Sequence, residues 1–351
     1  MTTLGDRLAA RIERDGALPF SEFVEAALYD EADGFYATGG AAGRRGDFIT
    51  SPEVGPLFGA VIAHALDAWW RDCGRPDPYR VVECGAGTGT LARAIVAAQP
   101  ACTGVLEYAL VERSDRLRAQ HPIGARFASY ASLGAVGHAH VVFANELLDN
   151  LAFDLVEFAA GGWREVRVAT DERGRFVEKL VDAAPELLSA VPATAPLGAR
   201  APVQRAAQAW LADALGSAPG GVVMIIDYAD ATASLATRPV GEWLRTYRAH
   251  ERGGAPIDAP GTQDITCEVA VDQLTAVRAP TRDRTQAEFL RAHGIDALVD
   301  EGRRVWHERA AVGDLAALRA RSRVREAEAL CDANGLGAYR VLEWQPASAP
   351  H

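Results

Sequence analysis

The stretch that decides the fold runs from Val81 to Thr90 and reads VVECGAGTGT. An apolar strand ends at Cys84, a glycine-rich turn follows, and a helix is expected to begin near Leu91. Glycine allows the backbone to turn tightly and to approach a ligand closely, and the start of a helix offers N–H groups that the helix leaves unpaired. We therefore expect a nucleotide-like cofactor at this turn. The alternative is a glycine turn that only packs the helix against the strand.

The spacing of the glycines distinguishes between cofactors. The dinucleotide fingerprint G-x-G-x-x-G requires a glycine at position 90, where this chain has Thr90, and the third glycine is Gly89 instead. A G-x-G-x-G turn preceded by Glu83 resembles motif I of class I S-adenosylmethionine (SAM) dependent methyltransferases. The resemblance implies SAM as the cofactor and disfavours a dehydrogenase.

Short apolar segments that alternate with helical segments extend this pattern along the chain. The predicted strands are 80–84, 107–112, 141–145, 222–228 and 339–344. Such alternation indicates parallel β-α-β units, in which helices cover both faces of the sheet. The expected fold class is α/β, a doubly wound, Rossmann-like sheet of the class I methyltransferase type, which binds ligands at the carboxyl ends of its strands.

The remaining segments divide the chain into a core and two additions. Residues 1–78 are predicted to form a helical and lid region, because apolar residues recur there at helical spacing. The SAM-binding core then comprises residues 79–150 and 220–351, and residues 151–219 form an insertion of two or three short strands and helices after the fourth strand. Residues 238–264 are irregular and too long for a loop that only connects two elements, so we expect a substrate loop there.

The composition of the 351-residue chain excludes several classes of protein. Its formal net charge is −11, and nucleic acid is not an expected partner because phosphate backbones are bound by clustered Lys and Arg. No apolar run approaches the roughly 20 residues of a membrane span, so no membrane partner is expected. The five cysteines form no C-x-x-C pair, which argues against a metal site and a disulfide framework and favours the cytoplasm. A homodimer is left open.

An acidic residue stands at the end of the second predicted strand. Glu112 ends that strand, roughly 20 residues beyond the glycine turn, where a carboxylate in nucleotide-binding folds accepts hydrogen bonds from both ribose hydroxyls. We predict that Glu112 binds the cofactor ribose. The alternative is a solvated surface carboxylate.

Carboxylates and amides follow the strand 141–145 in the segment NELLDN. Carboxylates hold a guanidinium through paired, charge-assisted hydrogen bonds and favour the lone pair that must attack the sulfonium methyl. Glu146 and Asp149, with Asn145 beside them, are therefore candidate catalytic residues that orient a methyl acceptor. The alternative is an acidic helix N-terminus that Asn145 caps.

The segment GDFITSPE, residues 46–53, contains a helix start with Ser51 as N-cap, Pro52 at the first helical position and Glu53 in the first turn. The cap does not explain Asp47 and Thr50, which we place in a lid over the cofactor. Local chemistry alone leaves a functional and a purely structural role equally open. His250 is a candidate general base at neutral pH, although a single loop histidine is more often solvated.

Beyond motif I, the chain resembles the MidA-like family of methyltransferases, whose members include a mitochondrial complex I assembly factor that methylates an arginine. The resemblance lies in residues 27–36, 46–53, 57–59, 83–91, 110–120, 145–151, 225–228, 244–250, 264–266 and 286–290. Together with the local patterns it implies cofactor-binding roles for Asp47, Thr50, Ser51, Pro52, Glu53, Glu83, Gly85, Ala86, Gly87, Gly89, Glu112, Arg113 and Asn145.

The resemblance implies methyl transfer to an arginine nitrogen of a protein. A small-molecule acceptor and a SAM-binding assembly factor or chaperone with little catalysis stay open as alternatives. Ala152 stands where the family commonly has proline, and residues 251–260 look individual, so the cofactor is better supported than the acceptor. The abundance of Ala, Arg and Gly suggests a bacterial source, where the target need not be complex I.

Overall fold

The computed structural model describes residues 2–39, 50–248, 251–309 and 314–346. The chain forms two compact units, and each is described by itself. The core unit comprises Ile49–Glu146, Ala214–Ile226 and Pro280–His351, and the accessory unit comprises Met1–Phe48, Leu147–Asp213 and Asp227–Ala279.

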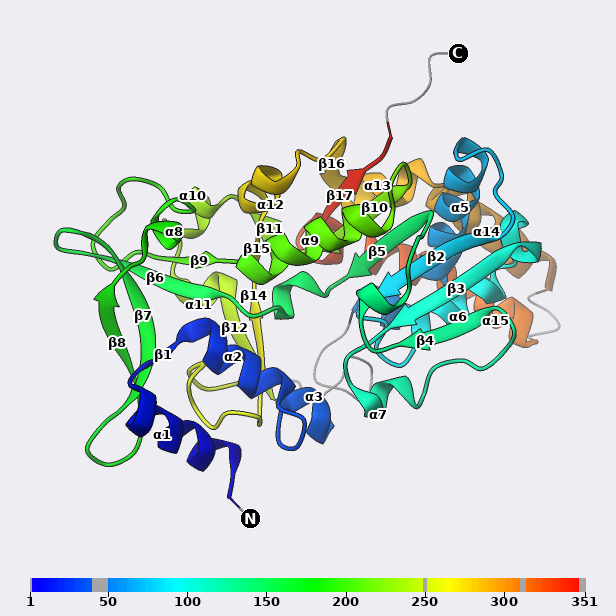
Figure 1. Ribbon diagram of the computed structural model, residues 1–351. Coiled ribbons are helices and arrows are strands. Elements are labelled where there is room, and N and C mark those ends of the chain that lie inside the picture. Colours follow the sequence, from blue (N-terminus) through cyan, green and yellow to red (C-terminus); the bar gives the residue numbers. More distant parts are fainter. Residues whose placement is uncertain (1, 40–49, 249–250, 310–313, 347–351) are drawn as a thin grey trace. The chain divides into compact units, whose positions relative to one another are not determined.

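The core unit is built on a seven-stranded sheet in the order β16-β17-β10-β5-β2-β3-β4, from red β17 through green β10 to cyan β3 in Figure 1. Its strands are β2 (Tyr79–Cys84), β3 (Leu106–Val111), β4 (Phe127–Tyr130), β5 (Val141–Asn145), β10 (Val222–Asp227), β16 (Arg282–Thr285) and β17 (Arg340–Trp344). β2 pairs in parallel with β3 and β5, β3 with β4, and β5 with β10. The predicted doubly wound α/β fold is confirmed.

The helices of the core unit are α4 (Ser51–Val54), α5 (Pro56–Asp72), α6 (Thr90–Ala97), α7 (Asp115–Arg118), α13 (Gln286–Ala292), α14 (Ile295–Arg309) and α15 (Leu315–Leu330). Of these, α5, α6, α13, α14 and α15 bury apolar residues in one cluster with the strands of the sheet. In α5, Phe58, Ile62, Leu66 and Trp69 are buried at helical spacing in one cluster with β2, β3 and β5. A Cβ at Gly59 would lie 2.4 Å from the Ala94 Cβ, so glycine lets α5 and α6 approach each other closely.

The accessory unit contains three sheets, β1-β7-β6-β9 with β8 beside β7, β13-β12-β14, and β11-β15. The strands are β1 (Leu18–Pro19), β6 (Asp154–Ala159), β7 (Gly162–Thr170), β8 (Phe176–Asp182), β9 (Arg200–Val203), β11 (Ala229–Asp230), β12 (Leu244–Arg248), β13 (Glu251–Arg252), β14 (Asp264–Cys267) and β15 (Val269–Ala270). The helices are α1 (Leu4–Asp15), α2 (Phe20–Tyr29), α3 (Phe35–Thr38), α8 (Pro185–Leu188), α9 (Arg205–Ser217), α10 (Thr232–Leu235), α11 (Val240–Trp243) and α12 (Val271–Val277). The boundary between the units falls within α9.

The compact units do not coincide with the predicted ranges. The region predicted as 1–78 is divided, because α5 packs in the core cluster whereas Phe20 and Phe23 of α2 belong to the core of the accessory unit. Residues 227–279, which were expected in the SAM-binding core, belong to the accessory unit.

Two structural predictions for the additions were wrong. The insertion holds four strands, β6 to β9, instead of two or three. Residues 238–264 are not irregular throughout, since β12 pairs with β14 in an antiparallel ladder that places Leu244 opposite Cys267. Leu244 and Thr246 are buried and alternate with more exposed neighbours, which is the period of a strand with one buried face.

Candidate functional site

The order of the strands in the core unit places a switch point between β2 and β5. The chain continues from β2 to β3 and β4 on one side, whereas β10 lies beyond β5 on the other. Cys84 pairs with Ala144, so the turn after β2 and Asn145 lie at the same edge of the sheet. Ligands of open α/β sheets bind at such an edge.

The glycine turn at this edge adopts a conformation that favours glycine. Gly85, Gly87 and Gly89 have φ angles of 69°, 52° and 79°, all in the left-handed region. A Cβ at Gly89 would lie 2.7 Å from the Pro122 Cδ, so Gly89 is required for packing. Among the described residues nothing lies within 4 Å of a Cβ built on Gly87, and this open space fits a bound cofactor.

The carboxylate of Glu112 lies against the glycine turn, immediately after β3. Its Oε2 accepts a hydrogen bond from the Gly87 N–H at 3.0 Å, and its Oε1 accepts one from the Ser114 N–H at 2.9 Å. Burial raises the pKa of Glu112 above its ordinary value. Contact with a ribose stays a prediction, but the solvated surface carboxylate of the alternative interpretation is excluded. Arg113 is exposed beside it.

Glu83 is buried within the core unit, with 5% of its surface exposed. Its Oε2 accepts a hydrogen bond of 2.6 Å from the Tyr108 hydroxyl of β3. Burial raises the pKa of Glu83 to about 7. Glu83 is thus held by a tyrosine that sequence analysis missed, and its predicted role in cofactor binding stays a prediction.

The helix after Thr50 starts one residue earlier than predicted. Thr50 occupies the N-cap position without a side-chain cap bond, and Ser51 is the first residue of α4. The predicted cap at Ser51 was wrong because its hydroxyl donates to Gln286 Oε1 at 3.0 Å instead. Pro52 and Glu53 follow in the first turn of α4 and are partly exposed.

Glu146 joins the start of α4 to the end of β5. Its Oε1 accepts hydrogen bonds of 3.0 Å from the Ser51 N–H and from Asn145 Nδ2. Glu146 has a φ of 51°, which is rare for a residue other than glycine and often marks a functional site. The alternative, a helix that Asn145 caps, is excluded, because Asn145 ends β5 and the next helical turn, Leu148–Asn150, has Leu147 at its N-cap position. Asn145 Oδ1 is buried and has no partner within the described part of the chain.

A cluster of buried acids and tyrosines lies in the accessory unit. Asp149 accepts a short hydrogen bond from the Tyr228 hydroxyl. Asp264 Oδ1 accepts hydrogen bonds from the Tyr36 hydroxyl at 3.2 Å and from Asn150 Nδ2 at 3.1 Å. The second oxygen of each acid, Asp149 Oδ1 and Asp264 Oδ2, is buried and has no partner among the described residues.

Burial determines the charge of these two acids. It raises the pKa of Asp149 to about 6, and burial together with the charge of Asp149 raises the pKa of Asp264 to about 8. Asp227 fixes the turn that carries Asp149, because its Oδ2 accepts the N–H groups of Leu148 and Asp149 at 3.0 and 3.3 Å. The cluster thus contains two buried carboxyl oxygens that lack a hydrogen-bond donor among the described residues, an arrangement that is costly unless a ligand supplies one.

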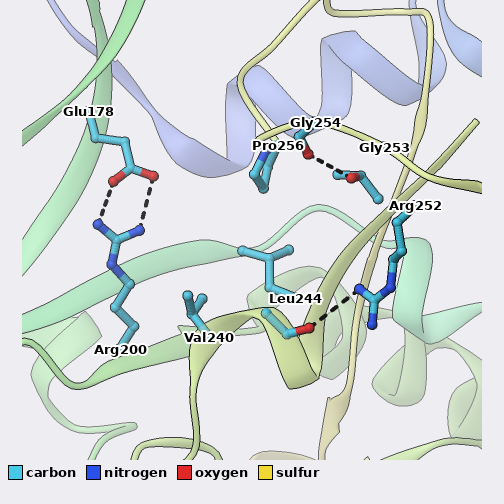
Figure 2. A pocket seen from close by; sticks show the side chains of 10 residues that line it. Glu178, Arg200, Val240, Leu244, Arg252, Gly253, Gly254 and Pro256 are labelled. Atoms are coloured by element: carbon cyan, nitrogen blue, oxygen red, sulfur yellow. Dashed lines mark hydrogen bonds and ion pairs between the residues drawn. The ribbon is translucent and has the colours of Figure 1, made fainter.

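The accessory unit also contains a pocket of about 220 Å³. Val240 and Leu244 line it, Arg252 donates to the Gly241 carbonyl on one side, and Arg200 is paired with Glu178 on the other (Figure 2). Five of its lining residues belong to α11, β12 and β13, within the predicted substrate loop. A role in substrate binding stays a prediction.

The structure thus brings together most of the predicted site residues of the core unit, from Thr50 to Asn145 and Glu146. Asp149 belongs to the accessory unit. Asp47 and His250 lie outside the described residues. In the described part of the chain, no group of three or more His, Cys, Asp or Glu side chains could hold a metal ion.

Sequence analysis assigned no role to the partners of the site residues, although all of them except Tyr108 lie in segments that carry the family resemblance. They are Tyr36, Tyr108, Asp227, Tyr228, Asp264 and Gln286. One of them was accessible from sequence, because Asp227 ends an apolar strand at the edge where ligands bind. The others pair with residues that are distant in the chain.

The fold and the glycine turn together define a class I SAM-dependent methyltransferase. A family model described as an S-adenosyl-L-methionine-dependent methyltransferase matches residues 61–289, and the chain belongs to this MidA-like family. A structure from Burkholderia thailandensis with bound S-adenosylhomocysteine aligns with a TM-score of 0.83 and 28% identity, over 99% of this chain and 92% of that one. A native structure from the same bacterium gives a TM-score of 0.82 at 27% identity, with the same coverage.

The chain is also similar to curated proteins that are named as methyltransferases. The mitochondrial protein arginine methyltransferase NDUFAF7 homolog of Drosophila melanogaster is 26% identical over 305 residues, which cover 76% of this chain and 68% of the relative. The Homo sapiens protein arginine methyltransferase NDUFAF7 is 27% identical over 346 residues, 84% of this chain and 74% of the relative. The cofactor of the family is SAM, and the open space at Gly87 and the carboxylate of Glu112 fit it.

Proposed function

We propose that this methyltransferase transfers a methyl group to an arginine nitrogen of a protein. The observation that carries the proposal is the pair of buried carboxyl groups, Asp149 and Asp264, each with one oxygen that lacks a donor within the described residues. The relatives that are named protein arginine methyltransferases support the same acceptor.

A guanidinium group matches these acceptors chemically. It presents five N–H donors in a planar fork and is always charged, so it can donate to two carboxyl groups at once. An unsatisfied buried acceptor costs about 1–3 kcal/mol, which a bound guanidinium offsets. SAM supplies a methyl group on a positively charged sulfur, and transfer is mostly a matter of holding the acceptor nitrogen in position. Asn145, Glu146 and His250 stay proposed as further acceptor residues.

The variants Asp149→Asn and Asp264→Asn test the proposal. Each should lower kcat/KM for an arginine-containing protein substrate about 10- to 100-fold, because a charged hydrogen bond to the guanidinium is lost. Binding of S-adenosylhomocysteine, measured by calorimetry, should be unchanged. Asp182→Asn is the control, since the Asp182 side chain is 94% exposed. Full transfer by both cluster variants would reject the acceptor site, and label in a small metabolite would identify the alternative acceptor.

We also propose that the enzyme is located in the cytoplasm and that its macromolecular partner is a protein. The five cysteines are free, which suits a reducing compartment. No helix in the described part of the chain is long and apolar enough to cross a membrane. A fluorescent fusion of the full chain, imaged in cells of the source organism, tests the location. A membrane or organelle signal would contradict it.

A further inference from the structure

A histidine outside the predicted site touches the centre of the glycine turn. His121 lies between α7 and β4 and is 7% exposed. Its Nε2 lies 3.0 Å from the carbonyl oxygen of Gly87, and its Nδ1 lies 2.8 Å from the Ser129 hydroxyl on β4.

These two contacts define the tautomer of the ring. A carbonyl oxygen can only accept a hydrogen bond, so Nε2 carries the proton and donates it to Gly87. Nδ1 then accepts the hydrogen bond of the Ser129 hydroxyl. Burial lowers the pKa of His121, which agrees with a neutral ring.

The residues on both sides of His121 also contact the turn or its helix. The Gln120 carbonyl accepts a hydrogen bond of 3.3 Å from Arg93 of α6. Pro122 packs against Gly89 so closely that a Cβ on that glycine would lie 2.7 Å from its Cδ. Residues 120–122 therefore form a continuous support behind the glycine turn.

Both peptide groups of Gly87 are therefore hydrogen-bonded to a side chain. Glu112 accepts its N–H, and His121 donates to its carbonyl oxygen. Because Gly87 has a left-handed φ of 52° and no side chain, the turn would otherwise have wide conformational freedom.

We propose that His121 is a positioning residue of the SAM site, which holds Gly87 in the conformation that leaves the turn open to the cofactor. The residue touches the turn and not the reacting atoms. The inference concerns cofactor binding, so it is independent of the identity of the methyl acceptor. If the turn is already ordered before the cofactor binds, the entropic cost of ordering it does not weaken binding.

Calorimetric titration of the full chain with S-adenosylhomocysteine tests the proposal. His121→Ala should raise Kd about fivefold or more, the equivalent of one hydrogen bond. His121→Gln should restore Kd to within about twofold of the wild type, because its amide N–H can reach the Gly87 carbonyl. His307→Ala is the matched control, since His307 is exposed on α14.

Two outcomes would overturn the proposal. One is an unchanged Kd for a folded His121→Ala protein. The other is an equal loss of binding in the Ala and Gln variants together with an equal fall in Tm, which would indicate lost packing. An independent measurement uses the wild type alone, because ¹⁵N NMR reports the tautomer of each imidazole. Protonation at Nε2 is expected for His121, and protonation at Nδ1 would contradict the contact with Gly87.

Discussion

At the scale of single residues, burial causes Glu83, a predicted cofactor-binding residue, to titrate near neutral pH. Its ordinary pKa of 4.5 rises to about 7 in the folded protein. The folded state therefore binds more protons than the unfolded state between these values, and stability falls as the pH rises through this window. The loss amounts to at most about 3 kcal/mol.

Glu83→Gln should remove this pH dependence, since glutamine keeps an acceptor for Tyr108 and cannot ionise. Urea denaturation of both proteins at several pH values between about 5 and 8 gives their free energies of unfolding. This range covers most of the interval between the two pKa values of Glu83. We expect the wild type to lose stability relative to the variant as the pH rises. Parallel curves would show that Glu83 ionises as easily in the folded as in the unfolded chain.

Two glycines of one turn should respond differently to the same substitution. Gly89→Ala forces a Cβ against Pro122 and should lower the free energy of unfolding by about 2 kcal/mol. Gly87→Ala costs about 1 kcal/mol for its left-handed φ, but its Cβ enters the open space and should weaken cofactor binding. Chemical denaturation and calorimetry separate the two effects. A larger loss of stability in Gly87→Ala together with a larger loss of cofactor binding in Gly89→Ala would contradict the geometry.

Asp264 should release a proton when the acceptor binds. Burial and the charge of Asp149 raise its pKa to about 8, so it is largely protonated at pH 7. A guanidinium beside it lowers that pKa and favours the carboxylate. Binding heats of an arginine peptide at pH 7, measured in buffers with different ionisation enthalpies, should reveal release of up to one proton. Binding without proton release would place the arginine elsewhere.

At the scale of elements, a carboxylate of α15 caps the start of α5. Glu326 is buried, and its Oε2 accepts the Leu57 N–H at 2.9 Å. A Cβ on Gly55 would lie 2.3 Å from the Glu326 carboxyl carbon, so glycine makes room for this cap.

Glu326→Ala should lower the free energy of unfolding by about 2 kcal/mol, because the Leu57 N–H is left buried without an acceptor. Glu328→Ala is the control, since Glu328 is exposed on the same helix, and its effect should stay within about 0.5 kcal/mol. Equal losses in urea denaturation would show that the change in stability does not depend on the cap.

The elements that sequence analysis found and missed differ in their apolar pattern. β5 has the predicted bounds, because Val141–Asn145 is a continuous apolar run that ends at an amide. β16 reads RDRT and contains no apolar residue, so only its antiparallel pairing with β17 defines it. Local pattern cannot reveal a strand that is stabilised by its neighbour alone.

At the scale of the whole molecule, sequence pattern predicts on which strand, turn or helix a candidate site residue stands, but not which distant residue it contacts. The glycine turn and the carboxylate at Glu112 could be predicted because strand, turn and helix are local in sequence. Ser51 bonds to Glu146 across 95 residues and to Gln286 across 235. Such pairs depend on the tertiary fold, and a single sequence contains no signal for them.

Cofactor binding should stabilise the unit that contains the glycine turn. A ligand at about 100 times its Kd adds about 2.7 kcal/mol to the stability of the state that binds it. Hydrogen exchange should therefore slow in the core unit when S-adenosylhomocysteine is added, most of all in residues 85–91. Slowing that is confined to the accessory unit would contradict the location of the cofactor.

The most direct test of the account is to identify the atom that receives the methyl group. The protein is incubated with SAM labelled in its methyl group and with proteins from its source organism, and the labelled products are hydrolysed and separated. Methylarginine that disappears with Asp149→Asn is the predicted result. Label on another amino acid or in a small metabolite would contradict the proposed acceptor, and no label at all would contradict catalysis itself.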